Sequence, residues 1–458
     1  MLQNAIMQEK MLFDINEITQ NPALEKLAGG KACGLAQSLD FAEELQKFGI
    51  DVSVPKTFVL SNECYQEYLK ENRVPNRTLV AAVKAMHAAG GTVAVRSSAD
   101  IEDGSDKSYS GEFESVLNVS TVEEMRQALQ TVYQSAENVV LENGKMPKMS
   151  VVIQQMISNP DYAGVAYSQD FDGDPFVVVN RTKGKTAEKL VQAEEEGEII
   201  KISKYVRKDA FGDKGIGVLT PEAYANFNPR YHFVSLRIDY KGEQIQAWAY
   251  KKAVDERFGK EVLPLVAAIN HLEAKQGHPI DMEFATKGGK IYILQQRPYL
   301  MKQNFVVKTL PNGDIVGYNA DSPIITSEMI DFNSPVFEQK YNKEANMFDL
   351  SGYIYCSVPC APSRNKWFLN AKHFAYYGGL KADLIVDNYG YMRTALYGHH
   401  GNMFRENGQP FWISAKGNAL QGIKSGEKVK IDLSQGTFEK LPSNNMQFFS
   451  HKNSLTYA

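Results

Sequence analysis

The sequence has few cysteines, no long apolar run and no excess of either charge. Its four cysteines are Cys33, Cys64, Cys356 and Cys360. So low a content fits a reducing compartment. Cys356 and Cys360 have no second pair with which to complete the four ligands of a structural zinc site. No stretch of about eighteen apolar residues occurs, so the sequence predicts no membrane-spanning helix.

The formal charges nearly cancel, with 50 Lys and Arg against 54 Asp and Glu and a net charge of -4. Such a balance gives no general attraction to nucleic acid or to anionic lipid, and neither is expected as a partner. The first twenty residues carry acidic side chains and no apolar core of the signal-peptide type. We therefore expect a cytoplasmic protein in which any polyanion binds to a local cluster of charges.

Helical and strand patterns alternate along the first 300 residues. The expected helices cover 30–48, 61–72, 121–143 and 260–277, with Ser120 or Thr121 placed to cap the third. The expected strands lie within 54–60, 92–99, 149–157, 162–168, 175–180, 278–286 and 290–298, and two more are expected around an acidic turn in 189–208. The strands within 278–286 and 290–298 form a hairpin joined by a Lys-Gly-Gly turn.

After Pro298 the sequence becomes polar, with scattered Gly, Pro and Asn. We expect a linker at 301–312, a second domain at 313–442 and a tail at 443–458. Strands of the second domain are expected at 353–359, 382–387, 409–414 and 427–433. The first domain, residues 1–300, is expected to have two lobes, at about 1–147 and 148–300.

Two segments have the composition of phosphate-binding loops. Gly29 and Gly30 precede Lys31 at the start of a predicted helix, where a close backbone and a helix N-terminus favour anions. Residues 98–116 are small and acidic, as in a glycine loop that closes over phosphates. Both patterns are also typical of ordinary helix starts and solvated loops, so this choice stays open.

The predicted hairpin carries Glu283, Gln295 and Arg297. Alternate residues of a strand share a face, so Gln295 and Arg297 point the same way, and Glu283 could face them from the other strand. A carboxylate, an amide oxygen and a guanidinium placed together would hold a divalent ion and a polyphosphate. The alternative is a surface hairpin with an ion pair between Glu283 and Arg297.

Seven segments occur in an informative order: GGKACGL, VPKTFVLSNECYQEYL, VRSSADIED, SYSGEFESVLNV, VVIQQMI, AGVAYSQD and IDMEFATKGGKIYILQQRP. Together they resemble the ATP-grasp-like domain of the phosphoenolpyruvate synthase, pyruvate phosphate dikinase and rifampin phosphotransferase family, over roughly residues 12–300. The resemblance implies an α/β (α+β) fold, with a two-lobed ATP-grasp-like nucleotide-binding domain followed by a smaller β/α swivelling-type domain. It also implies ATP and Mg²⁺ (or Mn²⁺) as cofactors.

The resemblance implies a role for each matching residue. Phosphate contacts fall to Lys31, Arg96 and Arg297, and the two arginines are counted as catalytic. The backbone of Ser108, Ser110 and Gly111 would close over the phosphates. Metal ligation falls to Glu283 and Gln295, and the adenine lies beside Gln154, Gln155, Met156 and Ile157. The family has a Gly-Leu-Gly-Glu-like segment where this chain has NRTKGKTAEKL, so the local geometry differs there, and Glu188 is the candidate for the glutamate.

Residues 382–392 and 404–441 resemble the family's swivelling domain, whose histidine carries a phosphoryl group. Counting back from Gly408 places His399 at the carrier position, whereas counting forward from Gly390 places Ala395 there. His399 is therefore the candidate carrier, with His400 as the other choice, because imidazole is a good nucleophile near neutral pH. The alternative is a domain that has lost its carrier.

The family's phosphoenolpyruvate-binding barrel has no counterpart here, so the chain is not expected to make phosphoenolpyruvate by itself. The expected function is a dikinase-type phosphotransferase that passes a phosphoryl group from ATP, through His399, to a small-molecule acceptor. AMP and phosphate would be the by-products. A separate subunit could supply the acceptor site. The alternatives are a direct ATP-dependent kinase or ligase, and a non-catalytic nucleotide-binding subunit.

Overall fold

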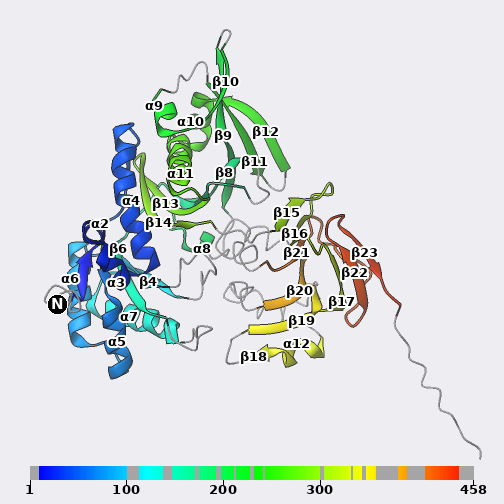
Figure 1. Cartoon of the computed structure of the whole chain (residues 1–458), viewed down its shortest axis with the longest axis horizontal. Helices are drawn as coiled ribbons and strands as arrows, with labels where there is room; N and C mark the ends of the chain where they lie inside the picture. The colour runs from blue at the N-terminus through cyan, green and yellow to red at the C-terminus, as the bar shows by residue number, and fades with distance from the viewer. Residues whose placement is uncertain are drawn as a thin grey trace, which may run out of the picture.

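The computed structural model describes most of the chain, in stretches separated by short gaps. The described residues are 10–100, 113–137, 147–170, 175–191, 197–210, 213–226, 232–240, 243–299, 304–331, 334–342, 347–356, 380–388 and 408–442. They form three β-sheets with helices packed on them (Figure 1). None of the described helices is long and apolar enough to cross a membrane.

The first sheet has five strands in the order β1-β3-β6-β4-β5, and all neighbours are antiparallel. Its strands are β1 (Leu12–Asp14), β3 (Thr57–Leu60), β6 (Met149–Gln155), β4 (Val93–Ala99) and β5 (Ser115–Val119). One face packs on α5 (Asn62–Glu71), α6 (Asn76–Ala88) and α7 (Val122–Glu137). Thr121 caps α7 as predicted: its Oγ1 accepts from the Glu124 backbone at 3.2 Å, and Glu124 accepts in return from the Ser120 backbone.

The second sheet has nine strands in the order β12-β11-β9-β8-β7-β13-β14-β2, with β10 beside β9. The strands are β2 (Val52–Ser53), β7 (Tyr162–Tyr167), β8 (Phe176–Lys183), β9 (Glu198–Ala210), β10 (Asp213–Val218), β11 (His232–Tyr240), β12 (Glu243–Tyr250), β13 (Ile280–Lys287) and β14 (Lys290–Pro298). One face packs on α10 (Lys251–Phe258) and α11 (Val262–Gln276), near α9 (Pro221–Ala225). Met282 and Phe284 of β13 point to these helices, so Asp281 and Glu283 point to the opposite face, which we name the site face.

Helix α4 (Gly30–Lys47) packs against both sheets, as the long blue helix of Figure 1 shows. Ala32, Leu35 and Ala36 share a core with the first sheet, alongside α2 (Asn16–Gln20), η1 (Pro22–Leu24) and α3 (Glu25–Ala28). Its later residues Phe41 and Leu45 belong to the core of the second sheet. Because one helix is buried in both cores, the two sheets are held at a fixed distance from each other.

The predicted hairpin and the predicted helix before it are confirmed as β13, β14 and α11. The turn uses Gly288 and Gly289 at φ of 61° and 83°, a conformation that favours glycine. The prediction of two strands within 189–208 is wrong in its first half. α8 (Glu188–Val191) stands there instead, and its Leu190 is buried, as is Ala187 just before the helix.

Two expected boundaries differ from the strand order. The expected change of lobe at 147/148 comes before β6, and β6 lies in the middle of the first sheet. The first sheet therefore extends to Gln155. The range expected as a linker, 301–312, contains β15 (Phe305–Thr309), which pairs with the third sheet.

The third sheet has the order β15-β16-β21-β20-β19-β17-β22-β23, with β18 beside β19. Its other strands are β16 (Ile315–Asn319), β17 (Ile324–Ile330), β18 (Tyr341–Asn342), β19 (Met347–Cys356), β20 (Leu380–Asp387), β21 (Phe411–Ile413), β22 (Lys428–Asp432) and β23 (Thr437–Lys440), and α12 (Pro335–Gln339) follows β17. The four central strands β17, β19, β20 and β21 are parallel. The strands expected within 382–387, 409–414 and 427–433 are confirmed, and the one expected at 353–359 is confirmed to residue 356, since 357–359 lie outside the described residues.

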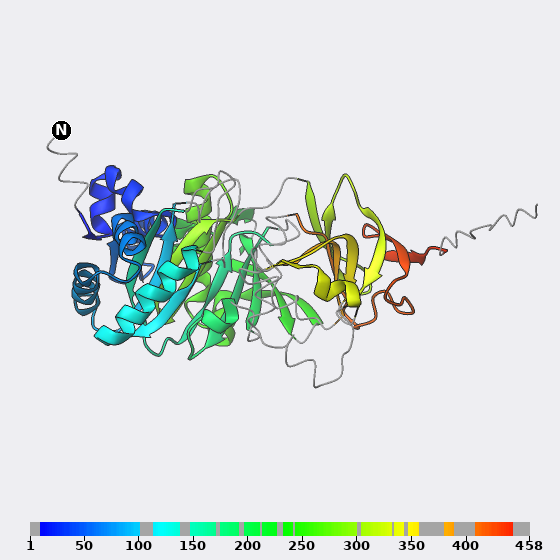
Figure 2. The same ribbon diagram turned by 90° about the horizontal axis from the view of Figure 1, so that it is seen from below.

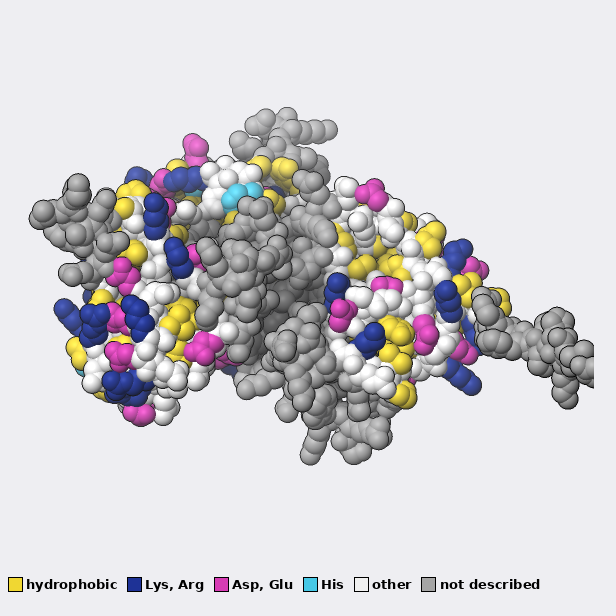
Figure 3. All heavy atoms as spheres, turned by 60° about the horizontal axis from the view of Figure 1, so that its bottom comes forward, with side chains coloured by type: hydrophobic (Ala, Val, Ile, Leu, Met, Phe, Trp, Pro, Cys, Tyr) yellow, Lys and Arg dark blue, Asp and Glu magenta, His cyan; other side chains and the backbone are white. Residues whose placement is uncertain are grey.

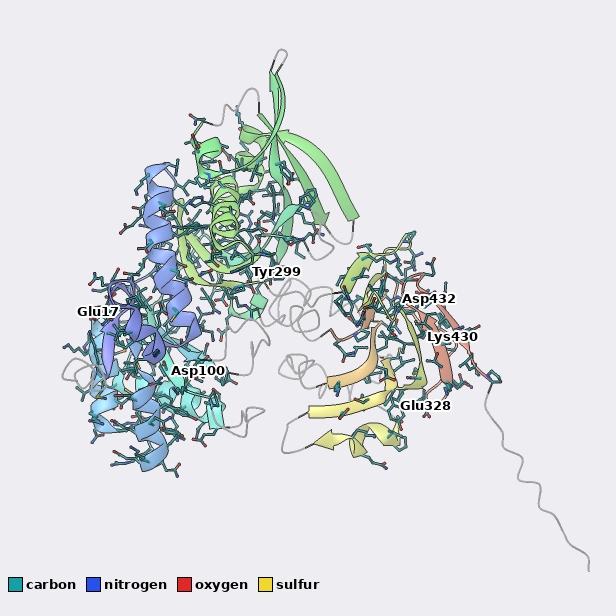
Figure 4. The ribbon with its side chains drawn as sticks, in the orientation of Figure 1. Glu17, Asp100, Tyr299, Glu328, Lys430 and Asp432 are labelled. Atoms are coloured by element: carbon teal, nitrogen blue, oxygen red, sulfur yellow. The ribbon has the colours of Figure 1, made fainter. Side chains whose placement is uncertain are left out.

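The third sheet packs on the second through a shared apolar core. Tyr167 and Val178 of the second sheet belong to one buried cluster with Phe305, Tyr355 and other residues of the third. Figure 2 shows the three sheets in succession along the length of the molecule. Tyr299, labelled in Figure 4, lies at the junction of the second and third sheets, and its ring is 5.3 Å from that of Tyr167.

Gly29 should be the most sensitive glycine at the start of α4. It has φ 75° and ψ 171°, a region populated almost only by glycine, and a Cβ there would lie 2.0 Å from the Ser98 carbonyl oxygen. We expect Gly29→Ala to lower the free energy of unfolding by about 3 kcal/mol or more, since strain and steric overlap add. Urea denaturation measures this loss.

Gly49, just after the same helix, is the matched control. It has φ 77°, and a Cβ added there would have no other atom within 4 Å, so Gly49→Ala should cost only about 1–2 kcal/mol of backbone strain. Equal losses for the two variants would contradict the close approach of Gly29 to β4.

Candidate nucleotide site

The hairpin places two acidic and two partner residues in register on the site face. Asp281 is directly opposite Arg297, and Glu283 is directly opposite Gln295. All four are less than a tenth exposed. The hairpin therefore places Glu283, Gln295 and Arg297 on one face, as predicted, and this face is buried.

A β-bulge lies beside this group. Glu283 pairs with Gln295 but Phe284 pairs with Ile293, so Leu294 is an extra residue on β14. The Leu294 carbonyl oxygen accepts hydrogen bonds from Arg96 Nη1 at 3.1 Å and from Gln154 Nε2 at 3.2 Å. Both donors belong to the first sheet, so the bulge turns one backbone carbonyl of the second sheet toward the first.

Arg96 of β4 crosses between the two sheets. Its Nη2 forms an ion pair with Glu283 Oε2, and its side chain is 13% exposed. Its Nε is buried and has no hydrogen-bond partner among the described residues. A guanidinium has five N–H donors, so Arg96 can donate to a further acceptor that enters the site.

Arg297 forms a buried ion pair with Asp281, not with Glu283. Its Nε and Nη2 donate to Asp281 Oδ2 at 3.0 and 2.9 Å. The alternative of a surface ion pair between Glu283 and Arg297 is therefore wrong, because residues in direct register lie closest. Sequence reasoning missed Asp281, although it stands two residues before Glu283 and so shares its face.

Lys31 lies in the first turn of α4, next to the strand that carries Arg96. Its Nζ donates to Ser97 Oγ at 2.8 Å. Ser98 fixes the same helix start, since its Oγ accepts from the Ala32 backbone at 3.1 Å and donates to the Ala28 carbonyl at 2.8 Å. The structure thus places Lys31 against Ser97, the residue that follows Arg96 on β4.

Residues 154–157 lead from the first sheet to the second. Gln155 is exposed, and Ile157 packs on a small apolar group that contains three buried alanines. We name this group the alanine patch: Ile157, Ala163, Ala187, Ala285, Tyr292 and Leu294. Ala187 comes from the segment that departs from the family pattern, and the exposed Glu188 begins α8 after it.

The site face changes character along β13. Ala285 belongs to the alanine patch, Glu283 comes next, and Asp281 follows. Tyr167, in register with Asp281, then enters the core shared with the third sheet. Each step of two residues advances about 7 Å along the strand. An apolar patch, a polar centre and the junction with the third sheet therefore follow one another.

Glu283 and Gln295 fit a hard divalent cation. A carboxylate and an amide oxygen side by side are ligand types that Mg²⁺ accepts, and Mg²⁺ usually takes only one or two protein groups besides substrate phosphates and water. Across the described stretches there is no group of three or more His, Cys, Asp or Glu that could hold a metal by itself. The pair therefore suits a cation that arrives with a polyphosphate.

Several predicted site residues cannot be placed. Ser108, Ser110 and Gly111 of the closing loop, and His399 and His400, lie outside the described residues. β20 ends at the buried Asp387, upstream of the two histidines.

Sequence comparison assigns the chain to a class of nucleotide-binding proteins. The family model for the pyruvate phosphate dikinase AMP/ATP-binding domain matches residues 76–312, more than half of the chain. The chain therefore belongs to the pyruvate phosphate dikinase and phosphoenolpyruvate synthase family, and the α/β nucleotide-binding fold expected from its motifs is confirmed.

Curated relatives match the chain over part of their length. A phosphoenolpyruvate synthase of Pseudomonas aeruginosa is 29% identical over 231 residues, 46% of this chain and 28% of the relative. The phosphoenolpyruvate synthase of Neisseria meningitidis is 28% identical over 233 residues, 46% and 28% of the two chains. A Bacillus subtilis protein named as an uncharacterized phosphotransferase is 24% identical over 306 residues, 60% and 33%. The chain spans about a quarter to a third of the length of these relatives.

Solved structures show more distant likeness. A Pyrococcus horikoshii protein has a TM-score of 0.29 at 11% identity, covering 62% of this chain and 94% of its own. The D-alanine–D-alanine ligase of Bacillus anthracis in complex with ATP has a TM-score of 0.20 at 14% identity, covering 61% and 63%. The family assignment rests on the sequence match.

Removing one partner of the buried Arg297 pair should be costly. Arg297→Met leaves the Asp281 carboxylate, which is 2% exposed, without its cation. We expect the free energy of unfolding to fall by about 3–5 kcal/mol. Adding Asp281→Leu to this variant should recover part of that loss, because it removes the uncompensated charge. Chemical denaturation of the single and double variants tests this.

Lys275→Met is the matched control, since Lys275 pairs with Glu44 at the surface and is 46% exposed. The free energy of unfolding of this variant should fall by less than about 1 kcal/mol. Similar losses for Arg297→Met and Lys275→Met would contradict a buried, charge-balanced pair at Arg297.

Proposed function

We propose that the chain is an ATP-dependent, dikinase-type phosphotransferase whose ATP site lies on the site face between the first two sheets. The observation that carries the proposal is the meeting of Arg96 with Glu283 across these sheets, within the segment that matches the family's AMP/ATP-binding domain. A cation, a carboxylate and an amide drawn from separate strands are what a polyphosphate and its metal require.

The alanine patch would take the adenine, with residues 154–157 along its edge. Small side chains leave room for a flat ring, and Tyr292 and Ile157 add apolar contact. The phosphates would then extend along β13 to the polar centre. There Lys31, Arg96 and Arg297 would offset their charge, and the backbone of Ser108, Ser110 and Gly111 would close over them.

Glu283 and Gln295 would hold the divalent ion, Mg²⁺ or Mn²⁺, which would offset the charge of the phosphates when bound. In the structure Arg96 is an ion-pair partner of Glu283. Phosphate would replace Glu283 as the partner of Arg96. Each buried charge therefore keeps an opposite charge on ligand binding, which avoids the cost of an unpaired buried ion.

The polar centre lies next to the junction with the third sheet, so the transferring end of the nucleotide would point toward the second domain. His399 of that domain is the proposed carrier, with His400 as the other candidate. Attack of its ring nitrogen on the β-phosphorus of ATP would transfer a pyrophosphoryl group and release AMP. Water would then cleave the terminal phosphate, which releases phosphate and leaves one phosphoryl group on the nitrogen. The acceptor would be a small molecule, bound by this chain or by a separate subunit.

The domain limits are part of the proposal. The ATP-binding domain would end near residue 300, and the second domain would run to 442 with β15 as its first strand, because β15 pairs with β16 of the third sheet. Residues 443–458 would follow as a tail.

The face drawn in Figure 3 carries interspersed acidic and basic side chains over the described residues, without one broad patch of either sign.

Nucleotide binding tests the site itself. Arg96→Met should weaken binding of an ATP analogue with Mg²⁺ by at least about 30-fold, since a buried charge contact is lost. Arg126→Met, at a half-exposed position of α7, is the control and should leave the dissociation constant unchanged. Isothermal titration calorimetry supplies both values, and unchanged binding in Arg96→Met would place the nucleotide elsewhere.

Product analysis tests the carrier. With ATP labelled at the β-phosphate, we expect acid-labile label to accumulate on the protein when the acceptor is withheld, and AMP and phosphate to appear together during turnover. His399→Ala should abolish the label, whereas His87→Ala, at an exposed position of α6, should retain it. Accumulation of ADP, or full activity in His399→Ala, would favour a direct kinase or ligase. Nucleotide binding without turnover would favour a non-catalytic subunit.

A further inference from the structure

Gln154 lies beside Arg96 on the first sheet. Gln154 is opposite Ala94, and Arg96 is opposite Val152, so the two side chains are diagonal neighbours on adjacent strands. Gln154 is only 2% exposed. A glutamine buried to this degree needs a hydrogen-bond partner, and it finds one in the second sheet.

The hydrogen-bond partner of Gln154 is the Leu294 carbonyl oxygen, which also accepts a hydrogen bond from Arg96. Gln154 Nε2 lies 3.2 Å from the Leu294 carbonyl oxygen, and Arg96 Nη1 lies 3.1 Å from it. A carbonyl oxygen has two lone pairs, so these two donors fill it. The guanidinium of Arg96 is thereby held at one backbone atom through Nη1 and at Glu283 through Nη2.

The acceptor is available because of the bulge. Leu294 is the extra residue of β14, so its carbonyl points out of the pairing with β13. Leu294 also belongs to the alanine patch. One backbone atom therefore lies between the proposed place of the base and the proposed place of the phosphates.

We propose that Gln154 is a positioning residue, whose amide fixes the Leu294 carbonyl and so sets the point from which Arg96 reaches the phosphates. This inference rests on the proposed function. The family resemblance places residues 154–157 beside the adenine as a group. Gln154 differs from Gln155 in that its side chain is turned into the joint between the sheets and leaves no exposed edge for a base.

A double-mutant cycle separates this role from a merely structural one. Gln154→Met keeps the length of the side chain and removes its donor, and should weaken binding of an ATP analogue with Mg²⁺ about tenfold. In an Arg96→Met background the same change should weaken binding by less than about twofold, because Gln154 acts through Arg96. Equal effects in the two backgrounds would overturn the proposal. Gln130→Met, exposed on α7, is the control.

Gln154→Asn gives a second measurement if Gln154→Met does not fold. Its amide is one methylene shorter, so its N–H is drawn back from the Leu294 carbonyl while the polarity of the side chain is kept. Binding of the ATP analogue should weaken about tenfold, and by less than about twofold in the Arg96→Met background. Equal effects in the two backgrounds would overturn the proposal. Failure of the wild type to bind any ATP analogue would instead overturn the proposed function itself.

Discussion

The ion pair between Arg96 and Glu283 is the interaction on which the arrangement of the first two sheets depends. Both charges are largely buried, and each comes from a different sheet. Burial of an unpaired charge is costly. Separation of the two sheets would break the ion pair between Arg96 and Glu283, so the pair favours the close approach of the sheets. Helix α4, buried in both cores, and the Leu294 carbonyl maintain the same approach.

This arrangement gives the site face a direction. The alanine patch, the Glu283 and Gln295 pair, and the Asp281 and Arg297 pair follow one another along the hairpin. The row ends at Tyr167 and Tyr299, where the third sheet packs. A nucleotide bound in this order would present its phosphates toward the second domain, which is the order that transfer to a carrier histidine requires.

Much of the site could be predicted because it depends on local patterns. Glu283, Gln295 and Arg297 were placed by strand alternation and a two-glycine turn, which fix register over a short span of chain. The AMP/ATP-binding family followed from the order of short motifs. The capping of α7 by Thr121 was likewise visible, since it involves residues three positions apart.

The rest depends on contacts between distant residues. The bulge at Leu294 is stabilised by Arg96 and Gln154, which lie 198 and 140 positions away. No local pattern in β14 indicates it. The placement of β6 within the first sheet depends on pairing with β3 and β4. α8 forms where a strand was expected, because Leu190 finds a buried contact that no local pattern shows.

A structure of the protein with a non-hydrolysable ATP analogue and Mn²⁺ tests the central claim most directly. The predicted result places the base on the alanine patch, the metal between Glu283 and Gln295, and a phosphate oxygen within hydrogen-bond distance of Arg96. A nucleotide bound away from the site face, or one that leaves the Arg96 and Glu283 pair intact, would contradict it.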